Sequence, residues 1–110
     1  MTRMACMQSA GMFSICTDAN HYTANATSID VTINNYHGAR MRYEIHLQLY
    51  DGVSWINTGY TSGHLLNYVE KSFALAGQRQ GNYRLYGKIR YDDVPGVVGE
   101  YYTPSFRVDR

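Results

Sequence analysis

The chain is poor in cysteine, proline and tryptophan, and its charges almost cancel. Its 110 residues include two Cys, two Pro and one Trp, and ten Lys plus Arg stand against nine Asp plus Glu, a formal net charge of +1. A charge so close to zero predicts no general attraction to nucleic acid or to anionic lipid. No stretch reaches the roughly 18 uncharged apolar residues that a membrane-spanning helix needs. We therefore expect neither a nucleic-acid partner nor membrane insertion.

Catalytic and metal-binding motifs are also missing. The sequence has no His-Glu-x-x-His pattern, no paired Cys-x-x-Cys, no Gly-x-Ser-x-Gly and no glycine-rich phosphate loop before a helix. Its four histidines are scattered and match no metal-ligand spacing: His21, His37, His46 and His64. The sequence therefore predicts a protein that is not an enzyme and holds no cofactor or metal. A calcium ion near Asp92 and Asp93 stays open, although the ligand spacing of an EF-hand is absent.

The composition that is present favours β-structure. Tyrosine occurs eleven times, hydrophobic residues make up 45% of the chain and charged residues 17%. Aromatic rings pack well on a pleated surface, and this balance of apolar and charged residues is that of a folded globular domain. A length of 110 residues is close to the commonest domain size, so we expect one domain.

Two stretches alternate apolar and polar residues with few errors, in residues 41–49 and 83–91. A period of two is the signature of a strand with one face in a core and the other in water. Similar patterns predict strands in 12–17, 28–34, 53–57, 68–76 and 101–108, with a turn at Asp51-Gly52 and a loop over 58–67. Lys71 interrupts the apolar face of its strand, which is typical of an edge strand.

Six or seven strands at a spacing of roughly 8 to 12 residues predict an all-β fold. The expected architecture is a two-sheet antiparallel β-sandwich with Greek-key connections, and a small closed barrel is the alternative. We expect residues 18–110 to form the body of the sandwich. Residues 1–17 form an N-terminal arm and first strand in this interpretation, tied by a disulfide between Cys6 and Cys16.

The two cysteines allow only one disulfide. A loop of this size would stabilise the fold by about 2 to 3 kcal/mol in the chain-entropy model. A disulfide would indicate an extracellular or periplasmic protein, whereas two reduced thiols would suit a cytosolic one. We expect the oxidised form.

Some segments resemble known families. The run Gln80-Gly81-Asn82-Tyr83 resembles the approach to the tyrosine corner of immunoglobulin-like and fibronectin type III-like domains, although Val31 and Gly87 or Ile89 stand where antibody domains carry cysteines. Residues 45–55 and the later Gly81-Asn82-Tyr83-Arg84-Leu85 are similar to small secreted immunoglobulin-like proteins of Gram-positive bacteria. This resemblance implies a secreted or cell-surface location and no particular activity.

The candidate binding site is the solvent side of the strands at 40–50, 83–92 and 101–108, if these strands are neighbours. That face would gather six of the ten cations with three tyrosines and a single acid, Glu44. The candidate residues are Arg40, Arg42, Tyr50, Arg84, Tyr86, Lys88, Arg90, Tyr101 and Arg107. Guanidinium groups bind carboxylate, sulfate or phosphate, and tyrosine adds contact area with a hydroxyl.

The sequence thus suggests a secreted, non-enzymatic recognition module whose partner is an anionic glycan, a cell-wall polymer or an acidic protein surface. An ordinary solvated sheet face would have a similar composition. The alternative function is a structural subunit of a surface fibre that assembles through the N-terminal arm, because an open sheet edge can pair with another chain.

Overall fold

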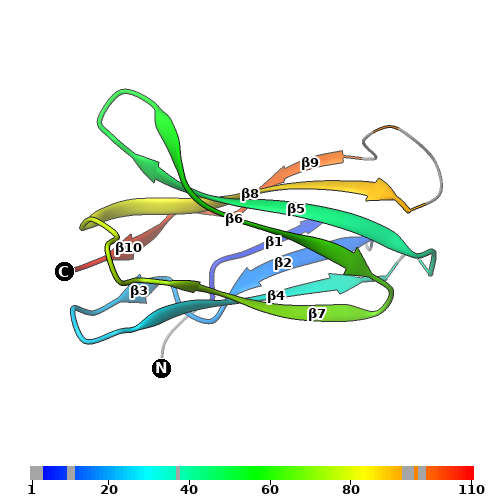
Figure 1. Cartoon of the computed structure of the whole chain (residues 1–110), viewed down its shortest axis with the longest axis horizontal. Coiled ribbons are helices and arrows are strands. Elements are labelled where there is room, and N and C mark those ends of the chain that lie inside the picture. Colours follow the sequence, from blue (N-terminus) through cyan, green and yellow to red (C-terminus); the bar gives the residue numbers. More distant parts are fainter. Residues whose placement is uncertain (1–3, 10–11, 37, 93–95, 97–98) are drawn as a thin grey trace.

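The computed structural model describes residues 4–9, 12–36, 38–92, 96 and 99–110. Two β-sheets pack face to face (Figure 1). One has four strands in the order β1 (Cys6–Ser9), β2 (Phe13–Thr17), β4 (Ser28–Asn35), β7 (Tyr68–Ala74). The other has six, in the order β3 (His21–Tyr22), β10 (Phe106–Val108), β8 (Gly81–Tyr91), β5 (Met41–Tyr50), β6 (Trp55–Leu65), with β9 (Gly99–Tyr102) also paired to β8. The predicted two-sheet sandwich is confirmed, and the closed barrel is not.

The alternating stretches form the two central strands of the six-stranded sheet. β5 and β8 pair antiparallel with Leu47 opposite Leu85 and Ile45 opposite Gly87. Their odd-numbered side chains are buried against the four-stranded sheet, as the alternation predicts. At Gly87 a Cβ atom would lie 2.8 Å from Cδ1 of Ile15, so the glycine leaves room for a side chain from the opposite sheet.

The predicted tyrosine corner is present at the start of β8. The ring of Tyr83 is buried and stacks on Phe106 at a centroid distance of 6.3 Å. Its hydroxyl donates a hydrogen bond to the carbonyl oxygen of Arg79 at 2.5 Å. The contact ties the turn before β8 to the buried strand that follows.

The predicted loop over residues 58–67 is wrong, because β6 continues to Leu65. The glycines of β6 allow side chains of neighbouring strands to pack closely against it, and they do not form turns. A Cβ atom on Gly59 would lie 3.0 Å from Cδ1 of Phe73, and one on Gly63 would lie 2.7 Å from the hydroxyl of Tyr43. The expected hairpin between β5 and β6 is confirmed, with positive φ (100°) at Gly52 in a four-residue connection.

The strand expected over 101–108 is divided, and Thr103 lies at the division. Its backbone N–H donates to the carbonyl oxygen of Leu85 at 3.0 Å, and its hydroxyl accepts the Leu85 N–H at 2.9 Å. The chain thus stays beside β8, but its register shifts by one residue between β9 and β10: Tyr102 lies opposite Tyr86, whereas Phe106 lies opposite Tyr83. β10 then pairs parallel with the short strand β3, an arrangement that the antiparallel prediction did not include.

The N-terminal arm contributes β1, an edge strand of the four-stranded sheet. β1 pairs with β2, and Cys6 and Cys16 lie opposite each other and form a disulfide, as predicted. Residues 1–3, 10 and 11 of the arm lie outside the described residues. β7 forms the other edge of this sheet, as Lys71 predicted.

Candidate functional site

The outer face of the six-stranded sheet brings together polar and aromatic side chains from four strands. β8 lies beside β5, so the adjacency on which the candidate site depended is present. Four outward pairs cross between these strands: Arg42 and Arg90, Glu44 and Lys88, His46 and Tyr86, Gln48 and Arg84. β6 flanks β5 on one side and β9 flanks β8 on the other, and both add further side chains.

Arg84 is the most firmly held cation on this face. Its guanidinium carbon lies 4.4 Å from the ring centroid of Trp55 and 4.3 Å from that of Tyr102. Its Nε–H donates to Oε1 of Gln48 at 2.8 Å, and the Gln48 amide donates to Oδ1 of Asn57 at 3.0 Å. We call these five residues the Arg84 clamp.

The clamp is built on a buried amide. Gln48 points toward the solvent side of the sheet, yet only 8% of its surface is exposed. A buried amide without partners is costly, and here both of its polar atoms are bonded within the clamp. Because Nε is bonded and the described residues make no hydrogen bond to Nη1 or Nη2, the two terminal nitrogens of Arg84 stay free for a partner.

A row of rings crosses the sheet next to the clamp. We call Tyr60, His46, Tyr86 and Tyr102, one from each of β6, β5, β8 and β9, the aromatic row. Neighbouring ring centroids lie 4.9 Å, 6.0 Å and 4.8 Å apart in that order. The rings of Tyr86 and Tyr102 are within 15° of parallel.

The hydroxyl of Tyr86 stays protonated at any physiological pH. Desolvation by its neighbours, a hydrogen bond to Glu100 and the negative charge of Glu100 raise the pKa of Tyr86 to about 12. Tyr86 is therefore a hydrogen-bond donor in the row. Glu100 accepts that bond and lies opposite Lys88 in the sheet register.

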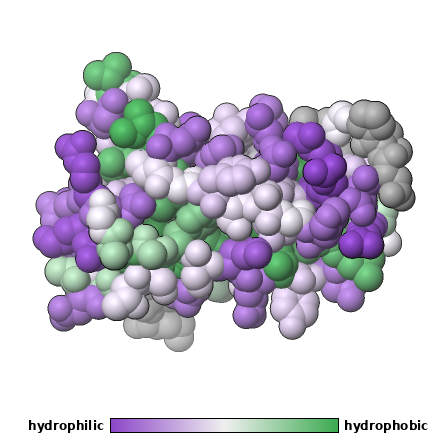
Figure 2. All heavy atoms as spheres, in the orientation of Figure 1, coloured by the Kyte–Doolittle hydropathy of each residue, from purple (hydrophilic) through white to green (hydrophobic). Residues whose placement is uncertain are grey.

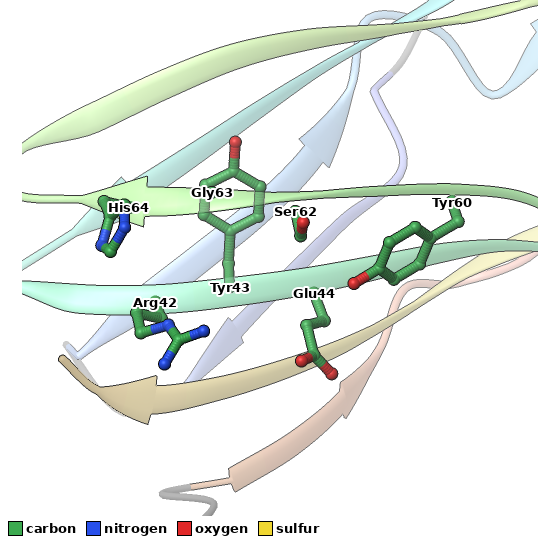
Figure 3. Close-up of a pocket in the computed structure, with 7 residues that line it drawn as sticks. All are labelled: Arg42, Tyr43, Glu44, Tyr60, Ser62, Gly63 and His64. Atoms are coloured by element: carbon green, nitrogen blue, oxygen red, sulfur yellow. The ribbon is translucent and has the colours of Figure 1, made fainter. Parts of the chain in front are cut away.

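A shallow polar hollow lies at the end of the row (Figure 3). It has a volume of about 160 Å³ and lies over the pairing of β5 with β6. Its lining residues are Arg42, Tyr43, Glu44, Tyr60, Ser62, Gly63 and His64. Tyr60 thus belongs to both the aromatic row and the hollow.

The excess of positive charge on this face is smaller than the sequence suggested. Four acids lie on it or at its ends, Glu44, Glu100, Asp92 and Asp109, where the alternation predicted only Glu44. Three of the six candidate cations form ion pairs, Arg40 with Asp92 at 3.2 Å, Arg90 with Glu44 at 3.5 Å and Arg107 with Asp109 at 3.1 Å. Among the described residues, Arg42, Arg84 and Lys88 make no such pair.

The prediction that Tyr101 lies on the outer face is wrong. Tyr101 lies opposite Gly87, packs against the core and has its ring centroid 5.9 Å from that of Phe13. Its neighbour Tyr102 points outward in its place. A one-residue shift in register between β9 and β10 explains the error, because alternation counted backward from Phe106 does not continue past Thr103.

Sequence reasoning also missed part of the site. Tyr50 lies where predicted, with its ring centroid 5.2 Å from that of Trp55. Trp55, Asn57 and Tyr60 were not candidates, because they follow the hairpin turn and their faces depend on the register. That register shifts between Leu47 and Gln48.

The hairpin between β5 and β6 projects from the sandwich (Figure 1). Figure 2 shows apolar atoms at its tip, where the side chain of Val53 is 89% exposed, above a surface that is otherwise mostly polar. The Asp51 carboxylate holds the connection by accepting the N–H groups of Val53 at 2.8 Å and Ser54 at 2.7 Å. These bonds lower the pKa of Asp51.

The described part of the chain offers no metal centre. None of its groups of His, Cys, Asp and Glu brings together three side chains able to hold a metal ion. Asp92 is engaged by Arg40 and by Nδ1 of His64 at 2.8 Å, and Asp93 lies outside the described residues. No helix long and apolar enough to cross a membrane occurs in the same part of the chain.

Comparison with known proteins gives no family. No protein-family model matches the sequence, and no curated protein is detectably similar to it. Any functional conclusion therefore depends on the chemistry of the face itself.

Proposed function

We propose that this protein is a non-enzymatic recognition module that binds an anionic glycan, such as an acidic cell-wall polymer, on the outer face of its six-stranded sheet. The observation that carries the proposal is the Arg84 clamp. Trp55 and Tyr102 stack on the guanidinium while Gln48 fixes its Nε, so a cation is held in place, and the described residues make no hydrogen bond to its two terminal nitrogens.

A guanidinium fixed in this way is suited to bind an oxyanion. Planar guanidinium groups donate two parallel hydrogen bonds to carboxylate, sulfate or phosphate. Arginine loses rotamer entropy when a ligand immobilises it, and the stacking rings have already restricted Arg84. Stacking on two rings and the bond to Gln48 therefore favour binding without a further conformational cost.

The aromatic row favours an extended, ring-shaped partner. Four neighbouring strands at about 4.8 Å spacing place its first and last rings roughly 14 Å apart. Because neighbouring rings of the row stack on one another, the row presents ring edges and tyrosine hydroxyls, which can contact and hydrogen-bond the polar groups of a partner. A flat strip of this length suits several units of a polymer better than a small molecule, which usually binds in a deep cavity.

The finer fold assignment and the location belong to the same proposal. The order β2-β4-β7 in one sheet, the pairing of β5 with β8 in the other, and the Tyr83 contact support an immunoglobulin-like sandwich. The disulfide supports a secreted or cell-surface protein, because disulfides persist in oxidising compartments.

The fibre subunit stays an alternative prediction that no observation favours. β1 hydrogen-bonds to β2 of its own chain and is cross-linked to it through Cys6 and Cys16. An arm held in this way is less suited to complete the sheet of a neighbouring copy.

A polymer-binding array tests the proposal. The purified protein is applied to acidic and neutral glycans and cell-wall polymers at low and high salt, together with the variants Arg84→Gln and Arg79→Gln. Arg79 is exposed in the turn before β8, so its replacement removes the same charge away from the clamp. We expect retention on acidic polymers that weakens with salt, because screening reduces electrostatic attraction.

Arg84→Gln should lower the affinity by about 10- to 150-fold, the equivalent of 1.5 to 3 kcal/mol for hydrogen bonds to a charged group. Arg79→Gln should bind like the wild type. Equal retention of the Arg84→Gln and wild-type proteins, with equal melting temperatures, would contradict the proposal.

A further inference from the structure

The polar hollow at the end of the aromatic row has the chemistry of a subsite. We infer that it seats one anionic monosaccharide unit of the polymer, with its acid group on Arg42 and its hydroxyl groups on Glu44 (Figure 3). The inference rests on the proposed function, because it names the kind of polymer unit that would bind at one end of the same sheet face.

The hollow exists because a small side chain stands between two large ones. Tyr60, Ser62 and His64 alternate along the outer face of β6, and Ser62 lies opposite Glu44 in the register. The serine leaves a gap between the two rings. Its volume of about 160 Å³ and its open side give room for a single polar ring and not for a larger group.

Arg42 supplies the cation of this subsite. It is exposed, and no carboxylate among the described residues lies within ion-pair distance of it. Its cross-strand neighbours are Arg90 and His64, and neither of them is an acid. The nearby acids are already engaged, Asp92 by Arg40 and His64, and Glu44 by Arg90.

Glu44 gives the hollow a second wall of opposite charge. Its carboxylate accepts hydrogen bonds and repels a second anion, whereas the hydroxyls of Ser62 and Tyr60 can donate or accept. A unit with an acid group on one side and hydroxyl groups on the other therefore fits both walls. A unit with acid groups on every side meets repulsion from Glu44.

The hollow and the row form one continuous path. Tyr60 ends the row at a centroid distance of 4.9 Å from His46 and also lines the hollow. Ser62 follows Tyr60 on the same face of β6, so the hollow lies beside the row along the strand, and a polymer that turns at Tyr60 places its next unit there. Arg84 stacks on Tyr102, which ends the row opposite Tyr60, so the guanidinium groups of Arg84 and Arg42 contact different units.

The test measures the binding of three acidic polymers that differ in their acid group: polygalacturonate, dextran sulfate and poly(glycerol phosphate). Fully methyl-esterified polygalacturonate and unsulfated dextran serve as the uncharged controls for polygalacturonate and dextran sulfate. The variants are Arg42→Gln, which removes the cation, and Ser62→Tyr, which fills the hollow. Ala74→Tyr on the exposed face of β7 is the control for adding a ring to a strand, because the replaced side chain makes no hydrogen bond.

We expect Arg42→Gln and Ser62→Tyr each to weaken binding of the best acidic polymer at least tenfold, with melting temperatures like that of Ala74→Tyr. Polygalacturonate, with one carboxylate and several hydroxyls in each unit, should bind more tightly than the densely charged dextran sulfate. If Arg84→Gln loses binding while Arg42→Gln and Ser62→Tyr keep it, the subsite is refuted and the proposed function stands. If no acidic polymer binds the wild-type protein, both are refuted.

Discussion

Replacing Tyr83 by Phe tests whether the tyrosine corner stabilises this sandwich. The ring of Tyr83 is fully buried and its stacking on Phe106 would remain, so the substitution removes only the hydroxyl. That hydroxyl donates to the carbonyl oxygen of Arg79 at 2.5 Å and lies 3.4 Å from Oε1 of Gln78. A net hydrogen bond contributes about 0.5 to 1.5 kcal/mol, and a carbonyl left without a partner adds to the cost. We expect a loss of about 1 to 2 kcal/mol.

Urea unfolding followed by circular dichroism measures this loss. The midpoint should fall while the slope with denaturant stays unchanged, since the surface exposed on unfolding is the same. The melting temperature should fall by roughly 4 °C or more per kcal/mol for a domain of this size.

Tyr43→Phe is the matched control for this experiment. Tyr43 is equally buried, and its hydroxyl makes no hydrogen bond within the described ranges of the chain. Its replacement should change stability by less than about 0.5 kcal/mol. Equal losses at Tyr43 and Tyr83 would refute the reasoning, because the effect would then follow from removing a buried oxygen and not from the bond to Arg79.

Two further predictions concern the whole fold. Replacing Cys6 and Cys16 by Ser should cost about 2 to 3 kcal/mol for a sequence separation of 10, and reducing agent should lower the wild-type melting temperature but not that of the variant. Alkali should unfold the protein, because burial raises the pKa of Tyr22 and Tyr83 while burial and Glu100 raise that of Tyr86 to about 12. A tyrosine whose pKa is higher in the folded than in the unfolded state stabilises the fold fully at pH values below about 10, its pKa in the unfolded chain. This stabilisation is lost as the pH rises through the pKa of the folded state. Urea unfolding at stepwise higher pH checks this, and constant stability between pH 9 and about 12 would contradict it.

The central strands could be predicted from sequence because a buried face imposes alternation. In β5 and β8 every second residue must be apolar, because a shift of the strand register by one residue would expose the core side chains to water. The pairs Gln48–Arg84 and His46–Tyr86 then follow once the two strands are neighbours. Alternation therefore identified the part of the site that lies on these two strands.

The rest of the site depends on features that alternation does not carry. Trp55 reaches Arg84 through a hairpin whose register shifts beside Gln48, and Tyr102 faces outward because the register along β8 shifts by one residue between β9 and β10. β6 contains glycines that fit against rings of other strands, and by composition alone they resemble those of a loop. These outcomes follow from contacts between distant segments, which one sequence does not show.

The Arg84 clamp joins residues from β5, β6, β8 and β9, which span more than half of the chain. The three partners of Arg84 all lie on other strands, so an unfolded chain has nothing comparable to offer a ligand. Occupancy of the face would therefore favour the native ensemble by mass action, by about 2.7 kcal/mol at a ligand concentration one hundred times the dissociation constant. Binding of the proposed ligand to this face would in this way be thermodynamically linked to folding.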